Sequence, residues 1–115
     1  MNRLTTCLLL LGIFIFIPHN GEAHPPRDME IVFIEEEQVL EISMIHVSSD
    51  PRDHFIRTVI VYKNGEETDK RLFTKQTTAQ GLTIQMPLQA QSGDVIEVKA
   101  ICNKAGFKTA SITIE

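Results

Sequence analysis

The sequence has no tryptophan, a single tyrosine and few positive charges. Aromatic residues make up 6% of its 115 residues, and 11 Lys and Arg stand against 15 Asp and Glu, giving a net charge of −4. Nucleic acids and anionic membrane surfaces are bound by clustered Lys and Arg, so the sequence predicts neither as a partner. The apolar fraction of 43% is nevertheless too high for an intrinsically disordered chain.

Cysteine is also scarce, and common catalytic motifs are missing. Two cysteines exclude a disulfide-rich scaffold. The length allows one domain and is far below the roughly 250 residues of a TIM barrel. We find no Ser–His–Asp set in a nucleophile context and no glycine-rich phosphate loop. We therefore assign no catalytic residues from motifs.

Residues 1–23 resemble a secretory signal peptide. A positive start at Arg3 precedes an apolar run over residues 8–17, which is shorter than the about 20 residues of a membrane-spanning helix. Small residues at Gly21 and Ala23 favour cleavage after Ala23. We therefore expect a periplasmic or secreted protein whose mature part, residues 24–115, forms one domain without a membrane span.

The mature part has the pattern of an all-β domain. Short runs rich in β-branched residues alternate with turn signals, and Asn64-Gly65 is a strong hairpin signal. Seven strands are predicted: 29–34, 39–46, 55–63, 67–73, 82–86, 95–102 and 109–114. This number and spacing favour an antiparallel, immunoglobulin-like β-sandwich of about seven strands.

Four residues that can bind metals lie at predicted strand ends. His46 and Cys102 follow the apolar face of their strands, His54 opens the next strand, and His24 leads into the first. Imidazoles and a thiolate together form a ligand set for iron, copper or zinc. Each of these residues also has a plainer interpretation, because strand-end histidines are often surface groups and a lone cysteine is often core packing.

Three blocks of the sequence resemble the iron-binding domain of the superoxide reductase family, which includes neelaredoxin and the C-terminal domain of desulfoferrodoxin. The first block is His24-Pro25-Pro26. The second is the segment from His46 to Ile56, which is similar to the family's His-Pro-x-Thr-Pro-x-His-x-Ile. The third is Cys102-Asn103-Lys104-Ala105-Gly106, which is similar to the family's Cys-Asn-x-His-Gly. Their order matches over nearly all of the mature chain. The family's fold is an immunoglobulin-like β-sandwich.

The resemblance implies a mononuclear, non-haem ferrous site that reduces superoxide to hydrogen peroxide. It implies equatorial ligand roles for His24, His46 and His54 and the axial role for Cys102. It also implies an external electron donor, such as a rubredoxin-type protein. Ala105 stands where the family has its fourth histidine, so the resemblance also allows reduced or lost activity.

Two other functions fit the same residues. One is a non-enzymatic β-sandwich that serves as a binding or carrier module, with contacts made by edge strands or by the loop over residues 75–81. The other is a copper-binding protein that uses the N-terminal amine and imidazole of His24 after cleavage, together with His46 or His54. This hypothesis rests on fold-level analogy.

Overall fold

The computed structural model describes residues 24–115, which fold into two antiparallel sheets without a helix. The predicted signal peptide, residues 1–23, lies outside the described residues and stays a prediction. Within the described residues, no helix has the length and apolar character needed to cross a membrane.

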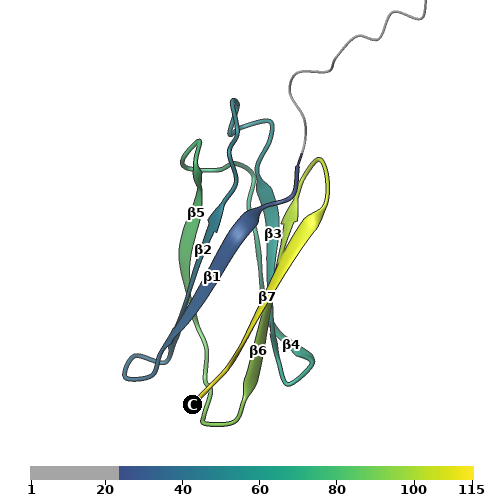
Figure 1. The fold of residues 1–115 in the computed structure, drawn as a ribbon. Helices are drawn as coiled ribbons and strands as arrows, with labels where there is room; N and C mark the ends of the chain where they lie inside the picture. The colour runs from purple at the N-terminus through teal and green to yellow at the C-terminus, as the bar shows by residue number, and fades with distance from the viewer. Residues whose placement is uncertain (1–23) are drawn as a thin grey trace, which may run out of the picture.

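All seven predicted strands are present, with ends that differ by at most two residues from the prediction. They are β1 (Arg27–Ile34), β2 (Val39–Ile45), β3 (Ile56–Lys63), β4 (Glu66–Leu72), β5 (Gly81–Pro87), β6 (Val95–Cys102) and β7 (Phe107–Thr113). One sheet has the order β1-β2-β5 and the other β4-β3-β6-β7. The sheets face each other, and β1 lies beside β7 where their edges meet (Figure 1). The predicted β-sandwich is therefore confirmed.

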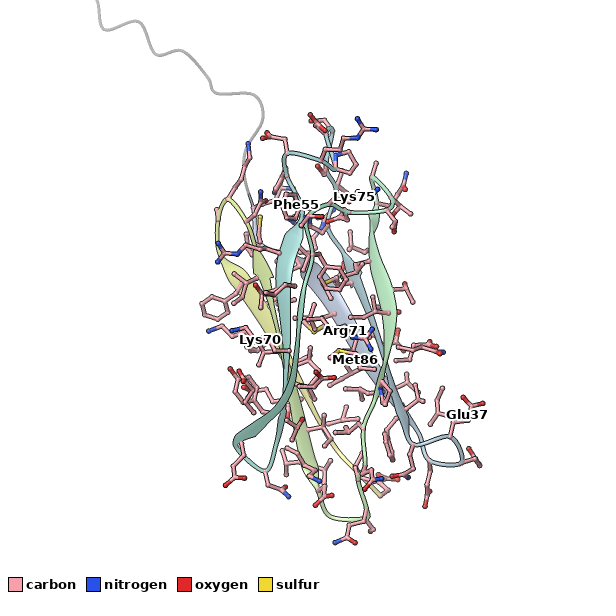
Figure 2. The ribbon with its side chains drawn as sticks, turned by 180° about the vertical axis from the view of Figure 1, so that it is seen from behind. Glu37, Phe55, Lys70, Arg71, Lys75 and Met86 are labelled. Carbon is pink, nitrogen blue, oxygen red and sulfur yellow. The ribbon has the colours of Figure 1, made fainter. Side chains whose placement is uncertain are left out.

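The core lies between the sheets and follows the period-2 pattern of the strands. In β2, Leu40 and Ile42 are fully buried, and in β6, Ile96 and Val98 are fully buried. Met86 of β5 pairs with Leu40 and points into the same layer (Figure 2). Because alternate side chains of a strand point to opposite faces, this burial fixes which face of each strand meets the other sheet.

The Asn64-Gly65 turn has the predicted hairpin geometry. Both residues have positive φ angles, of 52° and 85°, and they join Lys63 of β3 to its partner Glu66 of β4. Two central residues with positive φ are the signature of a type I′ turn, whose twist suits paired strands.

The two ends of the sandwich differ in their loops. The start of the described chain, the β2–β3 and β4–β5 loops and the β6–β7 loop all lie at one end (Figure 1). The β2–β3 and β4–β5 loops are joined there by backbone hydrogen bonds, Ser48 N–H to Ala79 O at 2.8 Å and Gln76 N–H to Pro51 O at 2.9 Å. The four candidate ligands lie at this end.

Candidate metal centre

Three histidines from three different segments come together at the loop-rich end of the sandwich. His24 precedes β1, His46 follows β2 and His54 precedes β3. Each offers one ring nitrogen such that all three nitrogens lie within 4.8 Å of one another. The ring centroids are 5.1 Å apart for His24–His46, 5.1 Å for His24–His54 and 4.5 Å for His46–His54, all in edge-to-face arrangements.

The thiol of Cys102 lies beside this cluster. Cys102 ends β6 and is 4% exposed, and its Sγ is 3.2 Å from Nε2 of His54. The backbone N–H of Lys104 donates to the same sulfur at 3.4 Å. Among the described residues Cys102 is a free cysteine.

The three imidazoles differ in how they are held. His46 is fully buried, with Nδ1 at 2.7 Å from Oε1 of Gln76 and Nε2 at 3.2 Å from the backbone oxygen of His24. His24 is partly exposed, and its Nε2 lies 2.9 Å from the backbone oxygen of Val47. This contact ties the segment before β1 to the loop that follows β2.

The environment of His54 favours its neutral form. Burial is the largest cause that lowers the pKa of His54 below its ordinary 6.5, and the neighbouring rings of His46 and His24 lower it further. A hydrogen bond with the backbone of His24 opposes this shift, whereas the positive charge of Lys104 adds to it. A neutral imidazole has a free lone pair on one ring nitrogen, and this neutral form is the one that binds metals.

The position of His54 is set by a network around Asn103. The side-chain oxygen of Asn103 accepts from Phe55 N–H at 2.9 Å, and its amide donates to the backbone oxygen of Asp53 at 2.8 Å. Lys104 pairs with the carboxylate of Asp53 at 2.5 Å. The β6–β7 loop, which follows Cys102, is thereby joined to the loop that ends at His54.

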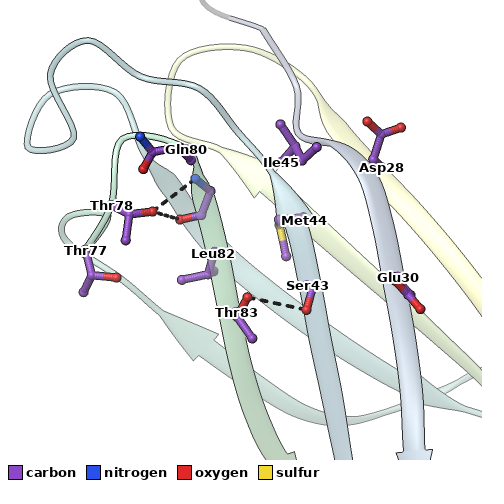
Figure 3. A pocket seen from close by; sticks show the side chains of 11 residues that line it. Asp28, Glu30, Ser43, Met44, Ile45, Thr77, Thr78, Gln80, Leu82 and Thr83 are labelled. Carbon is purple, nitrogen blue, oxygen red and sulfur yellow. Dashed lines mark hydrogen bonds between the residues drawn. The ribbon is translucent and has the colours of Figure 1, made fainter.

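The structure thus brings together all four residues that the sequence singles out, although metal binding by them stays a prediction. Sequence reasoning did not find Gln76, which contacts His46 from the β4–β5 loop. It lies among polar, exposed residues, so no periodicity marks it as buried. The surface hollow in Figure 3 is lined by β1, β2, the end of the β4–β5 loop and the start of β5, and by none of the four candidate ligands.

Comparisons with known proteins bear on the fold. No protein-family model matches the sequence, and neither does any curated protein. A solved variant of the superoxide reductase (neelaredoxin) from Ignicoccus hospitalis is similar, with a TM-score of 0.52, 19% identity, and coverage of 80% of this chain and 79% of that chain. Another structure of that protein has a TM-score of 0.46 at 19% identity, covering 80% of this chain and 81% of that chain. The chain described here has the superoxide reductase fold.

Proposed function

We propose that this protein is an extracytoplasmic iron-binding redox protein of the superoxide reductase type. His24, His46, His54 and Cys102 would hold a single iron ion. The observation that carries the proposal is the convergence of three ring nitrogens within 4.8 Å of one another, with a thiol 3.2 Å from one of them. The location is inferred from the signal-like residues 1–23.

The donor atoms present fit iron. Imidazole nitrogens suit iron, copper and zinc, and a thiolate favours the softer metals. The lowered pKa of His54 favours the neutral form of that ring near pH 7, and the N–H of Lys104 donates to Sγ at 3.4 Å. Compared with the family pattern the set lacks one imidazole, at Ala105, so we expect weaker binding and slower turnover than five protein ligands would give.

The chemistry that iron supplies in such a site is one-electron transfer to superoxide, which takes up two protons and becomes hydrogen peroxide. The chain's own contribution is to orient the four donors and, through burial of His54, to favour the neutral form of that imidazole. The electron comes from an external donor of rubredoxin type, since the described residues offer one candidate redox centre.

The test is metal analysis and activity of the full protein purified without oxygen from its native compartment. We expect about one equivalent of ferrous iron, a thiolate-to-iron charge-transfer band after oxidation, and superoxide consumption with stoichiometric peroxide. Cu²⁺ and Zn²⁺ titrations run alongside show which metal the site prefers.

Three outcomes separate the candidate functions. Stoichiometric iron without superoxide consumption would reduce the proposal to iron binding. Preferential copper binding that depends on cleavage after Ala23 would replace it with the copper hypothesis. Absence of stoichiometric metal, together with a stable protein partner, would overturn it in favour of a non-enzymatic binding module.

A further inference from the structure

Gln76 is a buried amide in a loop whose other residues are mostly exposed. Its side chain is 4% exposed, whereas Lys75 and Thr77 on either side are exposed. It lies 30 residues from His46 in the chain and contacts that histidine both through its ring and through its backbone. Burying an amide costs little free energy only when its polar atoms have hydrogen-bond partners. Here the side-chain oxygen and the side-chain nitrogen each have two.

The partners fix which way the amide points. The backbone N–H of Ile56 lies 3.2 Å from one side-chain atom of Gln76, and an N–H can only donate, so that atom is the oxygen. The other atom lies 2.7 Å from the backbone oxygen of His46 and 2.9 Å from that of Thr78, and carbonyls can only accept, so it is the nitrogen. If the amide were reversed, its oxygen would face the backbone oxygens of His46 and Thr78, and its nitrogen would face the N–H of Ile56.

This orientation favours one tautomer of His46. The oxygen of Gln76 lies 2.7 Å from Nδ1 of His46 and can only accept, so this contact is a hydrogen bond only when Nδ1 carries the proton. A neutral imidazole has one N–H, and the lone pair then sits on Nε2. The backbone oxygen of His24, 3.2 Å from Nε2, is also an acceptor, and a neutral ring can donate to only one of the two oxygens. The contact with Gln76 is the shorter, so it takes the N–H and leaves the lone pair of Nε2 facing the oxygen of His24.

The loop that carries Gln76 is itself anchored to the sheet. The hydroxyl of Thr78 donates to the backbone oxygen of Gly81 at 3.0 Å and lies 3.3 Å from the Gly81 N–H (Figure 3). Gly81 begins β5 and pairs with Ile45, the last residue of β2. The amide of Gln76 is thereby held against the end of β2, next to His46.

We propose that Gln76 is a positioning residue that holds His46 in the Nδ1–H tautomer and so presents Nε2 as its metal-binding atom. The inference rests on the proposed function for its consequence, metal affinity, but the tautomer can be measured without metal. Partners of this kind fix the tautomer and orientation of metal-binding histidines and raise their basicity.

The experiment compares Gln76→Leu, which removes the acceptor, with Gln76→Glu, which keeps an acceptor but loses both donated hydrogen bonds. Gln80→Leu, an exposed position in the same loop, is the matched control. The tautomer of His46 is read from ¹⁵N NMR of the metal-free proteins at about pH 8, above the ordinary histidine pKa of about 6.5. Ferrous iron affinity is measured on the same samples.

We expect Nδ1–H in the wild type, Gln76→Glu and Gln80→Leu. Gln76→Leu should lose this tautomer preference and bind ferrous iron about 10- to 100-fold more weakly. A purely structural role would lower the stability of both Gln76 variants without separating their tautomers. An Nε2–H tautomer in the wild type overturns the inference, even if Gln76→Leu does not fold.

Unchanged tautomer and affinity in folded Gln76→Leu also overturn the inference. Failure of the proposed function gives a different result, because a wild type that binds no iron still reports the tautomer of His46. In that case, if His46 carries the proton on Nδ1 and loses this preference in Gln76→Leu, the role of Gln76 in setting the tautomer is upheld while the metal site is rejected.

Discussion

Nε2 of His54 lies 3.2 Å from Sγ of Cys102, although 48 residues separate them in the chain. Strand register accounts for this contact. β3 and β6 are antiparallel neighbours in which Ile56 pairs with Cys102, and Asn103 N–H donates to Phe55 O at 3.0 Å just beyond the pair. Since the register of paired strands is fixed by their buried faces, the two side chains meet as a consequence of the core.

Replacement of the thiol tests its role as a ligand. Cys102→Ser should abolish the thiolate-to-iron charge-transfer band of the oxidised, iron-loaded protein and lower iron affinity by at least about 10-fold, because a serine hydroxyl stays protonated near pH 7. Absorption spectroscopy and iron titration check this. Circular dichroism and thermal unfolding show whether the variant is folded, and a retained band in folded protein would exclude Cys102 as a ligand.

The lowered pKa of His54 predicts how stability depends on pH in the metal-free protein. Below about pH 6.5 the unfolded chain takes up a proton on this ring while the folded protein does not. The free energy of unfolding should therefore fall as the pH falls from about 6.5 through the lower folded pKa. Urea unfolding at several pH values checks this, and His54→Gln should flatten the slope.

Asp94, at the other end of the sandwich, serves as a control because its carboxylate changes the pH dependence of stability in a separate, acidic range. A hydrogen bond from the side chain of Asn64 is the largest cause that lowers the pKa of Asp94 below 3.8, and a hydrogen bond from the backbone N–H of Gln91 lowers it further. Its contribution is present above about pH 3.8 and is lost as the pH falls through the lower folded pKa. Asp94→Asn should thus lower the free energy of unfolding by a constant amount above about pH 3.8 and change its pH dependence only in that acidic range. A change in the slope of stability against pH near pH 6 in Asp94→Asn would contradict this assignment.

Gly106 and Gly93 form a matched pair for testing the packing beside His24. Both have positive φ, 72° and 92°, but a Cβ added at Gly106 would lie 3.1 Å from Cβ of Pro25, whereas one added at Gly93 meets nothing within 4 Å. Each change to Ala should cost about 1–2 kcal/mol because of the left-handed backbone. Only Gly106→Ala should also weaken iron binding, since it displaces the residue next to His24.

Urea unfolding and iron titration measure the two effects of these glycine variants. Gly93 lies in the β5–β6 turn, at the end of the sandwich away from the histidines. Equal loss of iron affinity in both variants would mean that the site responds to overall stability and not to the contact with Pro25.

Asn103 should matter more for stability than its charged neighbour. Asn103→Ala leaves Phe55 N–H and the oxygen of Asp53 without their side-chain partner, so we expect a loss of about 1–3 kcal/mol. Lys104→Ala removes an ion pair whose side chains are 41% and 66% exposed, which should cost about 0–1 kcal/mol. Urea unfolding ranks the two, and a larger loss for Lys104→Ala would reverse this interpretation.

The sequence predicted the seven strands because their signals are local. The alternation of apolar and polar residues predicted the inward faces of β2 and β6, including the positions of His46 and Cys102, and the burial agrees. Asn64-Gly65 predicted the hairpin between β3 and β4. The convergence of the histidines was predictable to the extent that each lies at a strand end. Which strand ends share one end of the sandwich follows from the sheet order, which pattern alone does not determine.

The supporting contacts could not be predicted in this way. Gln76 is buried because of what surrounds it in space, the backbones of Ile56 and Thr78 and the ring of His46. Its sequence neighbours are polar and exposed, as in most loops. A side chain that acts through long-range hydrogen bonds leaves no periodic trace in the sequence.

The four donors come from both layers of the sandwich. His46 follows β2 in one sheet, whereas His54 and Cys102 adjoin β3 and β6 in the other. An ion bound by them would therefore cross-link the layers, in a domain whose described residues contain one cysteine and no disulfide. Metal loading would then slow amide hydrogen exchange at this end of the molecule and leave the opposite hairpin turns unchanged.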